Sequence, residues 1–427
     1  MPDIADPRAF LERLFYTAVA AADPDKALAA HLPEKPKGRT VVVGAGKGAA
    51  QMARAFERLW DAPLSGVVVT RYGYAVPCER IEVLEAAHPV PDESGLHASD
   101  RLMAAVGGLT EDDLVVALIC GGGSALLPAP AGDLTLADEI AVNRALLASG
   151  APIGAMNAVR KQVSRIKGGR LAALARPAKV VSLVVSDIPG DNPALVASGP
   201  TIADETTRAN ALAIIEHYGL DLPDAVMRHL EDGTDVPPLP SDPHFARNEI
   251  KLVASAAIAL DAAADVARKA GVETIVLSDA IEGEASEIGR QHGAIVAKIL
   301  QRGLASQEPM LLLSGGETTV TIKGKGKGKG GRNSEFLLSF ACAISGQKGI
   351  SALAADTDGI DGSEDNAGAF ADGTTVSRLA AREKDAAEFL ERNDSWSAFA
   401  AIDDLFVTGP TGTNVNDFRA ILLDPLD

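Results

Sequence analysis

The sequence predicts a two-domain α/β protein, with a mostly parallel sheet in the first domain and a smaller second domain, and three observations lead to this prediction. Short, continuous apolar segments alternate with longer helix-forming segments, as they do in βαβ units. The hydrophobic fraction is 47% but the aromatic fraction only 4%, which suits small-residue helices packed on parallel sheets. With 427 residues, the chain is long for one core and suits two domains.

The first domain is predicted to cover residues 1–240 and to begin with an amphipathic helix over 7–31. Apolar runs bounded by glycine, proline or charged residues predict its strands. These strands are expected at 40–43, 67–70, 81–86, 114–119 and 179–185. Between them we expect a helix ending near residue 60, a helix over 99–106 and further helices up to about residue 175.

The segment 232–243 contains four prolines and several acidic residues, and it is the predicted linker. The second domain is accordingly expected over 241–427, and its first strand near Lys251. Alanine-rich, helix-forming stretches predict helices over 256–270 and 285–302. Further strands are expected at 274–277, 310–313, 350–355 and 419–423.

Charge and cysteine content narrow the class of protein. A net charge of -18 and a pI near 4.9 argue against nucleic acid as a partner. The three cysteines are far apart and form no disulfide framework, so a reducing cytoplasm is expected. The chain starts without the pattern of a signal peptide and has no apolar run of about 18 residues, so no membrane association is expected. The oligomeric state stays open, a homodimer included.

Functional residues are expected where strands end, because ligands of open parallel sheets bind beyond the carboxyl ends of the strands. Five predicted strand ends carry glycine, aspartate, lysine or serine. They read GAGK, CGGGS, SDIPGD, SGGE and DTDGIDG. Three belong to the first predicted domain and two to the second, so an interdomain cleft is the expected place for them to converge.

The first of these motifs, GAGKGA, fits the dinucleotide fingerprint G-x-G-x-x-A. The acidic residue expected after the next strand is absent, and Arg71, which would suit a 2′-phosphate, stands there instead. We expect Gly44 and Gly46 to bind phosphate and Lys47 to reach a phosphoryl oxygen. The alternative is a tight strand–helix turn with a solvated lysine.

Two further glycine-rich segments predict anion binding. Gly121, Gly122, Gly123 and Ser124 form a strand–glycine–helix junction that would offer N–H groups and a helix dipole to phosphate. The alternative is that the glycines are needed for close packing of the strand and the helix. Residues 323–332 comprise only four Lys, one Arg and five Gly, a reversal of the chain's overall sign. Within and before this tract, the predicted phosphate ligands are Gly315, Gly316 and Lys329. The alternative for the tract is a solvated hairpin.

Carboxylates at strand ends are candidates for magnesium binding or proton transfer. Asp187 and Asp191 flank a proline-containing turn, and Asp187 could hold Mg²⁺ or accept the proton of an attacking hydroxyl. In the second predicted domain, Glu317 and Asp358 are further magnesium candidates. The alternative for such residues is a role in forming the turns themselves.

Substrate contacts are expected from a basic helical segment and from one histidine. Asn157 and Arg160 fall on one helical face, and Lys161 adds to a cationic patch that suits a carboxylate or phosphate. The patch could equally be an ordinary solvated face. His88 follows a strand and could contact substrate, although a hydrogen-bonded structural histidine is as good an interpretation.

Together these motifs resemble the class II glycerate kinases. The resemblance runs from about residue 10 to the C-terminus and rests on an ordered set of segments. They are VVVGAGKGA, AAHPVPD, CGGGSALLPAP, NAVRKQVSRIKGGRLA, SDIPGDNPALVASGPT, SGGETTVTIKGKGKGKGGRN, DTDGIDGSEDNAGA and TGTNVND.

The resemblance implies an N-terminal Rossmann-like α/β/α sandwich followed by a smaller α/β domain of the MOFRL type. It implies phosphorylation of D-glycerate by ATP on the 2-hydroxyl, with Mg²⁺ and an active site between the domains. The catalytic groups that it implies are Lys47, Asp187 and Arg332. The rival interpretations are an NADPH-dependent hydroxypyruvate reductase, suggested by the fingerprint and Arg71, and a noncatalytic sensor of phosphorylated metabolites.

Overall fold

A computed structural model describes residues 4, 6–303, 308–322 and 328–425. The chain forms two compact units. One comprises Pro24–Val253, and the other combines Met1–Asp23 with Ala254–Asp427. These limits differ from the predicted division after residue 240, both at the N-terminus and at the linker. The reasons lie in one helix and one strand, described below.

The unit 24–253 is organised around a six-stranded sheet. Its strands, in spatial order, are β3 (Ile81–Ala86), β2 (Ser65–Arg71), β1 (Thr40–Ala45), β4 (Leu114–Ile119), β5 (Lys179–Val185) and β6 (Glu249–Ala254). The pairings of β1 with β2 and β4, of β2 with β3, and of β4 with β5 are parallel, as predicted. The chain runs outward from β1 to β3 and then returns to the other side of β1. The strand order therefore reverses between β1 and β4.

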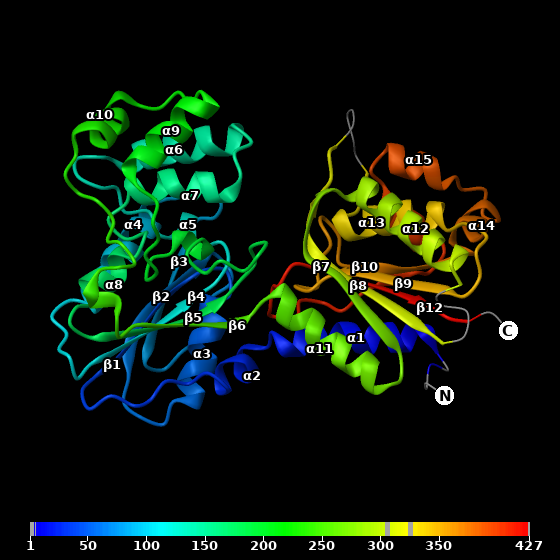
Figure 1. Cartoon of the computed structure of the whole chain (residues 1–427), viewed down its shortest axis with the longest axis horizontal. Helices are drawn as coiled ribbons and strands as arrows, with labels where there is room; N and C mark the ends of the chain where they lie inside the picture. Colours follow the sequence, from blue (N-terminus) through cyan, green and yellow to red (C-terminus); the bar gives the residue numbers. More distant parts are fainter. Residues whose placement is uncertain (1–3, 5, 304–307, 323–327, 426–427) are drawn as a thin grey trace. The chain divides into compact units, whose positions relative to one another are not determined.

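Helices of this unit fall into two groups. Those around the sheet are α2 (Pro24–Ala29), α3 (Ala49–Leu59), α4 (Glu93–Ala105), α5 (Gly123–Leu126) and α8 (Arg170–Leu174). A separate helical layer contains α6 (Leu136–Ala148), α7 (Ile153–Gln162), α9 (Arg208–Tyr218) and α10 (Asp224–Asp232), as Figure 1 shows. This layer has its own apolar core, formed by residues such as Val142, Val159 and Ile215. Two 3₁₀ turns, Val196–Ser198 and Pro243–Phe245, complete the unit.

The other unit also contains a six-stranded sheet. Its spatial order is β11 (Leu405–Phe406), β10 (Gly368–Asp372), β9 (Ile350–Asp356), β12 (Asp417–Leu423), β8 (Met310–Thr319) and β7 (Glu273–Glu284). Only β7 and β8 pair in parallel, and the remaining pairings are antiparallel. The mostly parallel sheet expected for the first domain is therefore confined to the unit 24–253. The C-terminal strand β12 inserts between β8 and β9, and short connections join β9 to β10.

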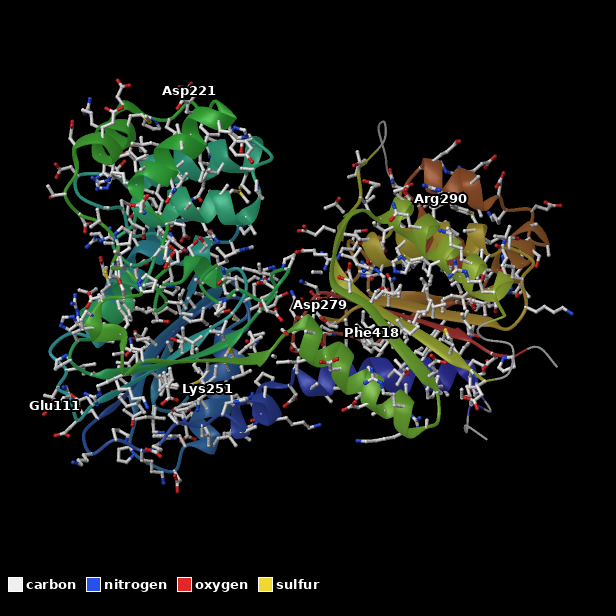
Figure 2. The ribbon with its side chains drawn as sticks, in the orientation of Figure 1. Glu111, Asp221, Lys251, Asp279, Arg290 and Phe418 are labelled. Atoms are coloured by element: carbon white, nitrogen blue, oxygen red, sulfur yellow. The ribbon has the colours of Figure 1, made fainter. Side chains whose placement is uncertain are left out.

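Helices cover both faces of this second sheet, as Figure 1 shows for the unit by itself. α12 (Ala285–Gln301) and α13 (Arg332–Ala343) lie on one face, and α1 (Pro7–Ala21) packs with α11 (Ala256–Lys269) on the other. Three short helices, α14 (Thr375–Ala380), α15 (Ala386–Glu391) and α16 (Ser395–Ala400), follow β10. Phe15 of α1 stacks edge-on against Phe406 and Phe418, at 5.1 and 5.8 Å between ring centres. Phe418, labelled in Figure 2, lies within the sheet.

Three differences from the predicted elements affect function. The expected helix over 7–31 is two helices, and α1 belongs to the unit formed mainly by the C-terminal half. The strand near Lys251 (Figure 2) is β6, which joins the first sheet instead of opening the second. Gly315 and Gly316 lie inside β8, not in a loop after it. In the described part of the chain, no helix combines the length and apolar character needed to cross a membrane.

Candidate functional site

The loop between β1 and α3 holds Lys47 at the point where the strand order of the first sheet reverses. The backbone N–H of Lys47 donates to the carbonyl of Gly121 at 2.8 Å, and the Thr70 hydroxyl donates to the carbonyl of Lys47 at 3.0 Å. A Cβ on Gly46, where φ is 138°, would stand 2.4 Å from the carbonyl oxygen of Cys120. The loop is therefore anchored to the end of β4, and it holds the half-buried Lys47 side chain at this edge.

The glycine run after β4 brings three predicted site residues together. A Cβ on Gly121 would stand 1.7 Å from Oδ2 of Asp187. A Cβ on Gly122 would stand 3.0 Å from Cγ of Lys47 and 3.2 Å from Nε2 of His88. Lys47, His88 and Asp187, which follow β1, β3 and β5, thus gather around these glycines. Glycine is required here because its neighbours occupy the space that a side chain would need.

The expected helix dipole at this junction is not supported by the structure. The helix that follows the glycines, α5, has only four residues, too few to build an appreciable macrodipole. Gly123 instead meets the Ala197 side chain, since a Cβ on Gly123 would lie 2.6 Å from Cβ of Ala197. The predicted N–H cradle therefore depends on the loop itself.

His88 is uncharged at neutral pH in this environment. Burial, followed by the nearby charges of Lys47 and Arg71, lowers the pKa of His88 to about 4. A neutral imidazole can donate or accept a hydrogen bond but cannot neutralise an anion. On the loop after β5, Asp191 has a left-handed backbone with φ of 52°, and its N–H donates to the carbonyl of Ile188 at 3.1 Å. This is the behaviour of a turn residue.

Asn157 and Arg160 on α7 form part of a polar chain that reaches the glycine run. The Asn157 amide donates to the carbonyl of Leu195 at 2.9 Å, and its oxygen accepts from Ser198 at 2.9 Å and Arg160 at 3.3 Å. Ser198 also bonds the hydroxyl of Ser124 at 2.8 Å. Arg160 additionally donates to the amide oxygen of Asn143 at 2.7 Å.

The structure places two lysines of this segment in buried ion pairs: Lys161, which was expected in the cationic patch, and Lys167. Lys161 is fully buried and pairs with Asp204, and burial lowers its pKa to about 8. Lys167 is also buried, and it pairs with Glu139 at 2.5 Å. These lysines therefore form internal ion pairs and not a surface patch, and Lys161 lies on the buried part of α7. Arg160 remains as the cation of the segment without a carboxylate partner among the described residues.

In the other unit, Arg332 is the first residue of α13 and donates to three carboxylates. Its Nε reaches Asp417 at 2.6 Å, Nη2 reaches Asp356 at 2.7 Å, and Nη1 reaches Glu317 at 2.8 Å. These acids come from adjacent positions of the sheet, since Asp417 pairs with both Gly316 and Asp356. Burial works to lower the pKa of Arg332, but the three acids together raise it. The guanidinium stays charged within a cluster that is acidic overall.

Asp417 is the centre of this second cluster. Its buried carboxylate also accepts from the Asn333 amide at 2.8 Å and from the Thr318 backbone N–H at 3.2 Å, and it pairs with the fully buried Arg419. Burial raises the pKa of Asp356 well above its usual value, although Arg332 opposes this. A cavity of about 340 Å³, lined by Thr318, Arg332, Asp356 and other residues, lies beside the cluster.

The expected phosphate ligands of this unit take other roles. A Cβ on Gly316, where φ is 117°, would lie 2.2 Å from the backbone nitrogen of Ile281, and the carbonyl of Gly315 accepts from Arg419 at 3.2 Å. Both glycines therefore serve strand packing. The Lys329 ammonium pairs with Glu364 at 3.2 Å and lies 4.7 Å from the centre of the Trp396 ring. Residues 323–327 of the glycine–lysine tract lie outside the described residues.

The predicted magnesium ligands do not form a cage for the metal. Among the described residues, no group of three or more His, Cys, Asp or Glu side chains is arranged to hold a metal ion. Glu317 is engaged by Arg332, and Asp358 accepts from the backbone N–H of Ile360 at 2.9 Å. Asp187, beside the glycine run, fits the kind of magnesium site in which one carboxylate acts together with the phosphates of a nucleotide.

Several residues of these clusters were not singled out from the sequence, although their segments were. Ser198 lies in SDIPGDNPALVASGPT, Asp356 opens DTDGIDG, and Asp417 closes TGTNVND. For Asp356 and Asp417 the available signal was their place at the end and at the start of a strand, whereas Ser198 offered no such signal. Their hydrogen-bond partners are distant in the chain, so no local pattern reveals them.

The fold and these clusters define a two-domain α/β protein with a lysine-bearing glycine loop where its first sheet reverses. Residues 10–231 match the model of a domain of unknown function, DUF4147, and residues 310–417 match that of the MOFRL family. The chain belongs to the family of class II glycerate kinases, which are enzymes.

The relatives carry two different names. A D-glycerate 2-kinase from Thermotoga maritima is 39% identical, with 94% of each chain covered. A protein from Agrobacterium vitis, provisionally named a hydroxypyruvate reductase, is 54% identical over 97% of this chain and 94% of its own. The crystal structure of glycerate kinase from T. maritima matches with a TM-score of 0.89 at 37% identity, covering 98% of this chain and 99% of that one.

Proposed function

We propose that this chain is an ATP- and Mg²⁺-dependent kinase that phosphorylates D-glycerate on its 2-hydroxyl and yields 2-phosphoglycerate. The observation that carries the proposal is the gathering of Lys47 and Asp187 around Gly121 and Gly122 at the reversal between β1 and β4. Ligands of doubly wound sheets bind at such a reversal. Relatives named as glycerate kinases support the choice of substrate.

In the proposed reaction, the 2-hydroxyl oxygen of glycerate forms a bond to the γ-phosphorus of ATP. The bond from that phosphorus to the β–γ bridging oxygen breaks, and ADP leaves. Asp187 accepts the hydroxyl proton or contributes to metal binding, and Lys47 stabilises charge on the transferred phosphoryl group. Mg²⁺ bound with the nucleotide would neutralise charge on its phosphate oxygens. Arg332 is proposed as a second cation for the transferred group.

Reduction of hydroxypyruvate is the second candidate, because the A. vitis relative carries that name and the strand order also suits a dinucleotide. The packing of the loop weighs against it. In dinucleotide sites the second glycine leaves room for the pyrophosphate, whereas at Gly46 the carbonyl oxygen and sulfur of Cys120 fill this space.

One set of assays separates the candidates. The purified chain is incubated with D-glycerate, ATP and Mg²⁺, ADP formation is followed, and the product is examined by phosphorus NMR. A parallel reaction with hydroxypyruvate follows the oxidation of NADPH. We expect 2-phosphoglycerate in the first reaction and no NADPH oxidation in the second. NADPH oxidation without phosphoryl transfer would overturn the proposal, and 3-phosphoglycerate as product would overturn its regiochemistry.

A further inference from the structure

Ser198 lies in a buried turn whose backbone is left-handed at three successive residues. The φ angles of Ala197, Ser198 and Gly199 are 52°, 60° and 60°. This conformation costs about 1–2 kcal/mol for each residue that is not glycine. The turn packs against the glycine run through Ala197 and Gly123. The surrounding structure therefore holds the Ser198 hydroxyl, which is completely buried, against Ser124.

The hydrogen-bond partners of Asn157 determine where the proton of Ser198 points. The carbonyl of Leu195 can only accept, so it must receive the N–H of the Asn157 amide. Arg160 can only donate, so it must face the amide oxygen. Because the Ser198 hydroxyl also bonds this oxygen, at 2.9 Å, Ser198 must donate its single proton to Asn157.

The orientation of Ser124 follows from that of Ser198. Ser198 has already donated its proton, so in the 2.8 Å bond between the two hydroxyls Ser124 is the donor. The oxygen of Ser124 then has lone pairs left and no proton to offer a ligand. Since Ser124 is only partly buried, this oxygen can accept a hydrogen bond from a bound molecule.

An acceptor at Ser124 suits an alcohol and does not suit a phosphate. Phosphate oxygens at neutral pH are themselves acceptors, whereas the hydroxyl of a substrate or of a ribose is a donor. The same polar chain ends at Arg160, which is held by two neutral amide oxygens. No carboxylate pairs with this guanidinium in the part of the chain that the structure describes. A partly buried cation that is linked through Asn157 and Ser198 to a hydroxyl acceptor fits a hydroxy acid better than a ribose.

We propose that Ser124 accepts a hydrogen bond from the glycerate hydroxyl that is not phosphorylated, while Arg160 binds the glycerate carboxylate. Ser198 is the positioning residue that keeps Ser124 in its accepting orientation. This inference rests on the proposed glycerate kinase activity, and it gives Ser124 a role other than the phosphate binding predicted from the sequence.

The first test compares two ligands that differ by one hydroxyl. D-lactate keeps the 2-hydroxyl of D-glycerate but lacks its 3-hydroxyl, so it competes with glycerate, as an inhibitor or as an alternative substrate, and cannot make the proposed bond. For Ser124→Ala we expect the KM for glycerate to rise about five- to tenfold, while the Ki of lactate and the KM for ATP change less than twofold. The KM for ATP could instead rise while the ratio of the KM for glycerate to the Ki of lactate stays unchanged. That result would assign Ser124 to the nucleotide and overturn the inference.

The second test removes the positioning hydroxyl while easing the backbone. Ser198→Gly suits a φ of 60°, so the variant should be at least as stable as the wild type in a thermal melt. Ser124 is then free to turn its proton toward the ligand, and we expect the preference for glycerate over lactate to fall at least threefold. A folded Ser198→Gly protein that keeps the full preference would overturn the positioning role.

A matched control is available in the same unit. Ser182 and Thr201 form a buried bond between hydroxyls of the same 2.8 Å length, away from the glycine run. Ser182→Ala therefore reports what the loss of such a bond does to folding, and its preference for glycerate over lactate should equal that of the wild type. If the wild-type chain transfers no phosphoryl group to D-glycerate, the proposed function itself fails. If the wild type does transfer it, the Ser124 and Ser198 variants test the roles of these two residues.

Discussion

The Lys47 ammonium group is the most direct residue-scale test of the proposed chemistry. Its backbone is fixed by bonds to Gly121 and Thr70, and its side chain passes beside Gly122. We expect Lys47→Ala to lower kcat by roughly 10²–10³, because it removes a preorganised charge from the reacting phosphoryl group. Circular dichroism should show an unchanged fold, and exposed Lys37→Ala should keep wild-type turnover. Normal kcat in a folded Lys47→Ala protein would exclude the proposed role.

The acids around Arg332 should differ sharply in their effect on stability. The Asp417 side chain is completely buried and accepts hydrogen bonds from Arg332, Arg419 and Asn333. The Glu317 side chain, in contrast, is 51% exposed. Asp417→Asn should lower the free energy of unfolding by about 3–5 kcal/mol, because it removes the only carboxylate that pairs with the fully buried Arg419 among the described residues. Glu317→Gln should change it by less than about 1 kcal/mol. Urea titration measures both, and equal losses would contradict this account of the cluster.

At the scale of elements, the junction after β4 depends on close approach to the loop after β5. Gly121→Ala would place a methyl group 1.7 Å from Oδ2 of Asp187, so the carboxylate or the loop must move. We expect kcat to fall about 10²-fold, the cost of a small misplacement in an active site. The matched control is Gly154→Ala in α7, where the added Cβ meets open space. That variant should keep kcat and gain up to about 1 kcal/mol of stability; similar kinetics in the two variants would contradict the prediction.

Prediction of elements from the sequence succeeded where apolar runs were long and local. β3, β4 and β5 begin and end where the apolar pattern predicted. β10 and β11 were missed, because they are short and gain their stability from neighbouring strands. Gly315 and Gly316 were interpreted as a strand end, since glycine usually interrupts a strand, but packing against β7 keeps them within β8. No local sequence pattern indicates that β12 inserts antiparallel between β8 and β9.

At the scale of the whole molecule, β6 determines where the first unit ends. The Lys179 ammonium pairs with Glu249 of β6, and Asn248 accepts from the backbone N–H of Val180 at 3.0 Å. A fragment 24–253 should therefore unfold cooperatively. A fragment 24–240, which lacks β6, should melt roughly 10 °C lower or aggregate, because β5 becomes an exposed edge. Thermal melts followed by circular dichroism compare the fragments, and equal melting temperatures would argue for the boundary predicted from the sequence.

The stability of the whole chain should depend on pH through His292. Its Nδ1 donates to the carbonyl of Ile288 at 2.9 Å, so Nε2 accepts from Ser314 at 3.1 Å, and burial lowers the pKa of His292 to about 4. In the unfolded chain the pKa of histidine is near 6.5. Between pH 4 and pH 6.5 the unfolded state therefore binds more protons than the folded state. Stability should therefore fall as pH falls from about 6.5 to 4, by about 3 kcal/mol at most from this residue.

The variant His292→Gln isolates the contribution of His292 to the pH dependence of stability, because glutamine does not titrate. The difference in unfolding free energy between wild type and variant should shrink as pH falls from 6.5 to 4. The exposed His97→Gln protein serves as control and should keep the wild-type slope. Urea unfolding at several pH values gives the comparison, and parallel slopes for wild type and His292→Gln would show that His292 does not carry this dependence.

The sequence by itself determined the α/β class, the central strands of the first sheet and the positions of Lys47 and Asp187 beside strand ends. These features follow from local hydrophobic patterns and turn-forming residues, whose effect does not depend on contacts with residues far away in the chain. Only the tertiary structure decided that Lys161 forms an internal ion pair, that α1 belongs with the C-terminal half, and that the hydroxyls of Ser198 and Ser124 meet. Each of these depends on contacts between residues far apart in the chain, and no short segment specifies such contacts.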